Sequence, residues 1–212
     1  MIKTVVGSFD TFSEAAAAAR DLRGAGFLDS DVNVIANNTR AIGREEKAVE
    51  EKSSGTATGI VAGGALGGAA GLAVSLMGLA IPGIGPILAA GPIAAALAGA
   101  GAGAVAGGLI GGLTDLGVNE THAEFYAEAV RRGAALVTVR ADESRADEAE
   151  QIIRRHGAFD IEDRVLQWKS AGWKGYDPKS EPFTFEEIER DRTLYHAAPR
   201  GPAAEIGRME NS

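Results

Sequence analysis

The feature that most constrains this chain is a long central stretch without charge. Residues 53–114 contain no Asp, Glu, Lys, Arg or His, and glycine recurs there at every fourth position on both sides of a break at residues 81–86. The recurring glycines form two ladders: Gly59, Gly63, Gly67 and Gly71 before the break, and Gly99, Gly103, Gly107 and Gly111 after it. Ladders of this kind favour close approach of two backbones.

The spacing of the ladders predicts an antiparallel helical hairpin. Residues four apart stay on one side of a helix, and each glycine of the first ladder has a mirror partner in the second, with Gly85 at the centre. We expect two Gly/Ala-rich helical arms, residues 56–79 and 92–113, that pack through these glycines. The predicted turn between the arms contains Pro82, Gly83, Gly85 and Pro86.

The sequence before the ladders predicts a βαβ unit. A strand-like run at residues 5–9 is followed by Thr11 and Glu14, which have the spacing of a capping box at the start of a helix. Gly24 or Gly26 can end that helix, and residues 32–36 are a second strand-like run.

A related unit follows the ladders. Asn119 is a good cap for a helix that Gly133 ends, and residues 135–139 have strand composition. A second helix is predicted to begin near Ser144, and residues 159–168 are predicted to be the fourth strand.

Two such units pair naturally as a ferredoxin-like βαβ…βαβ sandwich, with one antiparallel sheet and helices on one face. The sequence therefore predicts an α+β fold in which a ferredoxin-like domain is interrupted by a long Gly/Ala-rich antiparallel helical hairpin. The predicted boundaries are residues 1–37 for the first half, 38–54 for a charged connector, 55–114 for the hairpin, 115–168 for a helix plus the second half, and 169–212 for an extended tail with a short helix near 184–195.

Composition and motifs argue against several functions. The net charge of −8, without a Lys/Arg cluster, argues against nucleic acid as a partner. The pattern Gly101-x-Gly103 lacks the preceding strand that a dinucleotide-binding loop requires, and His122 points away from the face that Glu120 and Glu124 share on a helix. We therefore expect no enzyme activity, no cofactor and no metal site.

The two halves resemble the bacterial heat-induced general stress protein family. The matching residues are the strand and helix of residues 5–27 and the downstream run of residues 124–139. The central stretch resembles the glycine-zipper hairpins of small bacterial membrane proteins. This resemblance implies a stress-related, non-enzymatic bacterial protein, and it supplies no catalytic residues.

Three functions fit these observations. The first is a membrane protein whose hairpin inserts into the lipid bilayer and self-associates, in the bacterial inner membrane with both termini cytoplasmic, since each arm is uncharged and long enough to span. The alternative is a soluble homo-oligomer in the cytoplasm, a cage, ring or filament held by glycine zippers between chains. The third is a small-ligand sensor that uses a face of the sheet.

Overall fold

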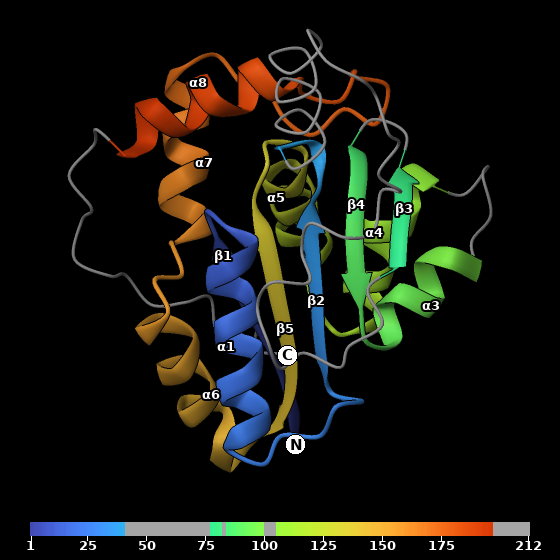
Figure 1. Ribbon diagram of the computed structural model, residues 1–212, viewed down its shortest axis with the longest axis vertical. Coiled ribbons are helices and arrows are strands. Elements are labelled where there is room, and N and C mark those ends of the chain that lie inside the picture. The colour runs from blue at the N-terminus through green and yellow to red at the C-terminus, as the bar shows by residue number, and fades with distance from the viewer. Residues whose placement is uncertain (41–76, 82–83, 100–104, 197–212) are drawn as a thin grey trace, which may run out of the picture.

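Five short strands form one antiparallel sheet in the computed structural model, which describes residues 1–40, 77–81, 84–99 and 105–196. The order across the sheet is β1-β5-β2-β4-β3, and each neighbouring pair is antiparallel. Figure 1 shows β3 at one side of the sheet and α8 lying across one end of the molecule. The strands are β1 (Ile2–Phe9), β2 (Val32–Asn37), β3 (Met77–Ile81), β4 (Gly85–Ala90) and β5 (Ala135–Asp142).

Helices lie against both faces of this sheet, because its strands carry apolar residues on both sides. Val5 and Phe9 belong to a core cluster with α1 (Phe12–Gly24) and α6 (Glu143–Arg155). Val6, Ile35 and Leu136 belong to a second cluster on the opposite face. That second cluster includes residues of α3 (Pro92–Gly99), α4 (Val105–Asp115), α5 (Glu120–Arg131) and α7 (Ile161–Ser170). The predicted α+β class is therefore confirmed, whereas the prediction of helices on one face is wrong.

The predicted helix starts are present because their capping residues satisfy free backbone N–H groups. At α1, the Glu14 N–H donates to the Thr11 hydroxyl at 3.2 Å, and the Thr11 N–H donates to the Glu14 carboxylate at 3.0 Å. At α5, the His122 N–H donates to the Asn119 side chain at 2.9 Å.

The predicted fourth strand at residues 159–168 is wrong. Its place is taken by α7, which starts where the Asp160 side chain accepts from the N–H groups of the next turn. Ile161, Val165 and Trp168 are the buried residues of α7, at helical rather than strand spacing. In the described residues, strand-like pairing of this segment is a single bridge between Phe159 and Ser8. A complete ferredoxin-like sheet is therefore not confirmed.

The predicted helical hairpin is not confirmed either. Both sides of the break are strands, since β3 and β4 pair in register from Met77 with Ala89 to Ile81 with Gly85. The predicted second arm contains two separate helices, α3 and α4. Ile81, Ile84 and Ile87 are buried in the second core cluster, so the break segment gains apolar burial that a Gly/Ala helix would not supply. Most of the predicted first arm lies outside the described residues.

The membrane-inserting function is contradicted. Among the described residues, no helix is both long enough and apolar enough to cross a bilayer. In the predicted second arm, α3 has 8 residues and α4 has 11, whereas a span requires about 20. The apolar stretch after the break instead forms β4, which is a strand of the sheet, and the helices α3 and α4, which pack in the second core cluster.

Candidate functional site

Three ladder glycines lie in the described residues and the first ladder lies outside them, so the predicted alignment of the two stripes stays a prediction. Gly99 lies in α3, Gly107 and Gly111 lie in α4, and α3 packs against α4. A Cβ built on Gly111 meets no described atom within 4 Å, so this face of α4 has room for a neighbour. The remaining ladder positions lie outside the described residues: Gly59, Gly63, Gly67, Gly71 and Gly103.

The predicted turn is a turn between strands rather than between helices. Gly85 has a φ of 101°, in the left-handed region that glycine adopts without steric cost. Pro86 is the second residue of β4, and its carbonyl accepts from the Asn38 N–H at 2.8 Å. Pro82 and Gly83 lie outside the described residues. The segments on both sides of these residues are therefore strands and not the predicted helices.

The outer side of β3 is the first candidate interaction surface. β3 is the last strand of the sheet, and no described strand pairs with it on the side away from β4. Gly78 on this strand is exposed, and a Cβ built there meets no described atom within 4 Å. β3 carries no charged side chain, although charged residues are a common protection of sheet edges.

A second candidate is the cluster that holds α8 (Phe185–His196) to the domain. Its centre is Glu128 near the end of α5, whose side chain is fully buried. One edge of the Arg131 guanidinium, Nε and Nη2, donates to the two oxygens of the Glu128 carboxylate at 2.9 and 2.8 Å, and Arg132 donates to it at 2.5 Å. Arg132 also donates to Asp191 of α8 at 3.0 Å. The buried Glu128 carboxylate thus binds both Arg131 and Arg132, and Arg132 connects it to α8.

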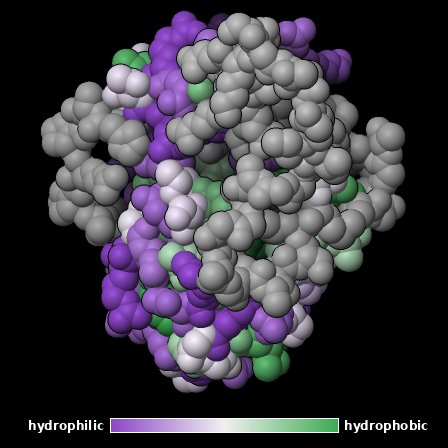
Figure 2. Space-filling model, viewed as in Figure 1, coloured by the Kyte–Doolittle hydropathy of each residue, from purple (hydrophilic) through white to green (hydrophobic). Residues whose placement is uncertain are grey.

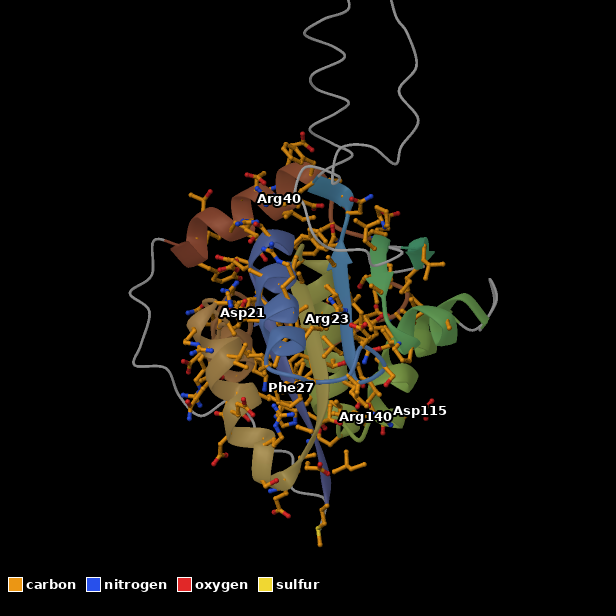
Figure 3. The ribbon with its side chains drawn as sticks, turned by 60° about the horizontal axis from the view of Figure 1, so that its bottom comes forward. Asp21, Arg23, Phe27, Arg40, Asp115 and Arg140 are labelled. Carbon is orange, nitrogen blue, oxygen red and sulfur yellow. The ribbon has the colours of Figure 1, made fainter. Side chains whose placement is uncertain are left out.

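Further polar contacts join α8 to other ends of the fold. Arg40, just after β2, pairs with Glu189 of α8, and Figure 3 places Arg40 beside that helix. Arg192 donates to the Asp10 carbonyl at 2.7 Å, just after β1. Ile188 is fully buried, so a single apolar residue anchors the centre of α8.

Aromatic rings complete the contacts of the α8 cluster. Arg132 lies over the rings of Trp168 and Phe183, at 4.8 and 4.9 Å from their centroids. Arg164 lies over Tyr195 at 4.5 Å. Burial and the neighbouring Asp191 raise the pKa of Tyr195 to about 12. Burial opposes the charged form of Arg132, but Glu128 and Asp191 outweigh it and raise the pKa of this guanidinium.

Sequence reasoning missed this cluster. A segment expected to be mostly extended packs on the domain through α8, although its short helix was predicted near the correct residues. The signal for the cluster was the position of Glu128, three and four residues before Arg131 and Arg132, which allows helical ion pairs. The sequence alone does not show that Glu128 lies on the buried face of α5.

The cluster offers little space for a small molecule. The cavity lined by Arg132, Arg164, Asp191 and Tyr195 has room for about one water molecule. A second cavity, beside Ser8, His122, Tyr126 and Glu162, is equally small. Among the described residues, no group of three or more His, Cys, Asp or Glu side chains is arranged to hold a metal ion.

No protein-family model, curated protein or solved structure matches this chain. The resemblance of its two halves to the heat-induced general stress proteins therefore stays a prediction. The two candidate surfaces of the described residues are the uncharged edge at β3 and the polar cluster under α8.

Proposed function

We propose that this protein is a non-enzymatic structural protein that self-associates, with the uncharged insert supplying the contacts between copies. The observation that carries this proposal is the position of β3, at the end of the sheet with no described strand on its outer side. An unpaired edge presents backbone N–H and C=O groups that favour pairing with another chain.

The helix α4 supports the same proposal. Gly111 lies on α4, and a Cβ at this position meets no described atom. A glycine without a neighbour allows close approach of a second backbone, which is the contact that a glycine zipper between chains requires. Repetition of such contacts would build the cage, ring or filament that the sequence suggests.

The described cavities and polar groups also favour a structural role over catalysis. The carboxylates and guanidinium groups of the α8 cluster bond to one another, and the adjacent cavity holds about one water molecule. A catalytic site usually combines a ligand-sized pocket with groups free to react.

Native mass spectrometry and sedimentation of the full chain test the proposal. We expect particles at a multiple of the chain mass of 21.8 kDa. Gly111→Leu should reduce the particle size, because leucine occupies the space that a neighbouring backbone would use. The chain should still fold, since a Cβ at Gly111 clashes with no described atom.

A matched control is Gly24→Leu at the end of α1. Gly24 is exposed, whereas Gly111 is half-buried, and a Cβ at either position meets no described atom within 4 Å. We expect this variant to keep the particle size of the unaltered chain. A monomer for the unaltered chain at all concentrations would overturn the proposal, whereas equal particle sizes for the two variants would exclude the α4 contact and leave the β3 edge.

A further inference from the structure

We propose that two copies of this chain pair through β3, strand against strand and antiparallel, so that their sheets become continuous. This inference rests on the proposed self-association and names the backbone groups that make the contact. The pairing is symmetric about Leu79, so that Gly78 of each copy lies opposite Ala80 of the other.

The register of the sheet identifies the backbone groups that face outward from β3. The Pro86 carbonyl accepts from Asn38, so the backbone polar groups of Pro86 face β2. Ala80 lies opposite Pro86 across the β3–β4 ladder and therefore directs its own N–H and C=O away from β4. Gly78, two residues earlier, has the same orientation.

Symmetric pairing satisfies these outward groups completely. With the twofold axis at Leu79, Gly78 and Ala80 of one copy form hydrogen-bonded pairs with Ala80 and Gly78 of the other. Each such pair contributes two N–H···O=C bonds, so the contact contains four. The two Leu79 residues face each other as a non-hydrogen-bonded pair, whose Cα atoms are typically about 4.5 Å apart.

A second copy fits this edge better than a charged partner does. β3 and β4 carry no charged residue, so an ion pair with a partner has no counterpart on these strands. Gly78 has no side chain and an open Cβ position, so the neighbouring backbone can approach without a clash in the described structure. An isologous contact also needs only that one surface be complementary to itself.

Disulfide trapping tests this register directly, because the chain contains no cysteine. Leu79→Cys places one thiol on each copy, at a Cα separation that permits a disulfide. Under a mild oxidant that accepts the electrons of the two thiols, we expect a covalent dimer on non-reducing gels. The control Gly24→Cys, at an exposed position at the end of α1, should remain largely uncrosslinked.

A second variant removes a hydrogen bond between copies while keeping those within the chain. Ala80→Pro removes an N–H that faces away from β4, and proline is tolerated on edge strands. We expect the dissociation constant of the pair to rise at least about tenfold, since each copy loses one donor. Far-UV circular dichroism should remain that of the unaltered chain.

The outcomes separate this inference from the proposed function. An unaltered chain that is monomeric throughout overturns both. An oligomer that resists crosslinking at position 79 and ignores Ala80→Pro overturns the strand pairing and leaves self-association through α4. Crosslinking at position 79 with weakened association of Ala80→Pro supports the pairing.

Discussion

At the β1 edge of the sheet, later parts of the chain contact the strand, whereas at the β3 edge no described segment does so. The Phe159 N–H donates to the Ser8 carbonyl at 2.8 Å, and Lys3 forms an ion pair with Glu143 at 3.1 Å. The β3 edge has neither a bridge of this kind in the described residues nor a charged side chain. Figure 1 shows β3 on the far side of the sheet from α6 and α7.

This difference indicates two uses of polar residues. Around β1, α7 and α8, charged side chains form ion pairs and hydrogen bonds within the chain. The described surface over α1 and α6 is largely hydrophilic, as Figure 2 shows, and includes the pair of His156 with Asp21 at 2.8 Å. In the insert, β3, β4 and α3 carry no charged side chain, and Ile81, Ile87 and Ile93 pack into the second core cluster.

The largest expected effect on stability comes from the buried Glu128 of the α8 cluster. Glu128→Ala should lower the free energy of unfolding by about 3–5 kcal/mol, because it leaves the buried Arg131 and the partly buried Arg132 without their shared carboxylate. Urea unfolding measures the loss. The control Glu148→Ala removes a half-exposed partner of Arg145 and should cost less than about 1 kcal/mol. Equal losses in the two variants would contradict a central role for Glu128.

The second prediction concerns Gly133, where the α8 cluster meets the end of α5. A Cβ at Gly133 would lie 2.5 Å from Cγ2 of Ile188, and Gly133 has a φ of 95°. Gly133→Ala should cost about 2 kcal/mol or more, from backbone strain and displacement of α8. In this variant, the rate of amide hydrogen exchange should rise more in α8 than in α1, relative to the unaltered chain.

Gly26→Ala is the matched control for this prediction. Gly26 has a φ of 87°, but a Cβ there meets nothing within 4 Å. The control should therefore show the backbone cost alone, about 1–2 kcal/mol, without faster exchange in α8. Identical exchange of α8 in both variants would show that Ile188 accommodates the added methyl group.

The third prediction concerns the β3 edge of the sheet. Gly78→Lys gives β3 the charged protection that sheet edges commonly carry, and should weaken self-association at least about tenfold. The free energy of unfolding should change by less than about 0.5 kcal/mol, because Gly78 is exposed and its Cβ position is open. Sedimentation at several concentrations measures the change, and Gly24→Lys is the control. Unweakened association of Gly78→Lys would place the contact elsewhere.

The smallest expected effect is a pH dependence of the free energy of unfolding that comes from Tyr195 in the α8 cluster. The pKa of Tyr195 rises from 10.0 to about 12 in the folded chain, so the folded state holds this proton more tightly than the unfolded state. The resulting stabilisation is complete below pH 10 and is lost as the pH rises towards 12. Unfolding measured between these pH values should show a decline that Tyr195→Phe reduces. An unchanged slope in Tyr195→Phe would assign the decline to other groups.

Local patterns predicted many of the elements. The capping residues Thr11, Glu14 and Asn119 located the starts of α1 and α5, because such caps act within one helical turn. The failure at residues 159–168 is also local in origin, since Asp160 caps a helix whose apolar residues have helical spacing. A strand was predicted there because the second half was expected to repeat the βαβ order of the first.

The candidate surfaces were less accessible to sequence reasoning. The uncharged stretch was identified, but its glycines were assigned to two long helices. The sheet instead receives β3 and β4, because Ile81 and Ile87 bury against neighbouring elements that no local pattern reveals. The cluster around Glu128 joins α5 to Asp191 of α8, 63 positions further along the sequence (191 − 128).

By itself the sequence determined the α+β class, the starts of α1 and α5 and the lack of charge in the insert. These properties depend on residues within a few positions of one another. The tertiary structure decided that the turn joins strands, that helices cover both faces of the sheet, and that the two edges differ. Those outcomes depend on which distant segments bury one another, since apolar burial depends on the whole set of neighbours that a side chain meets.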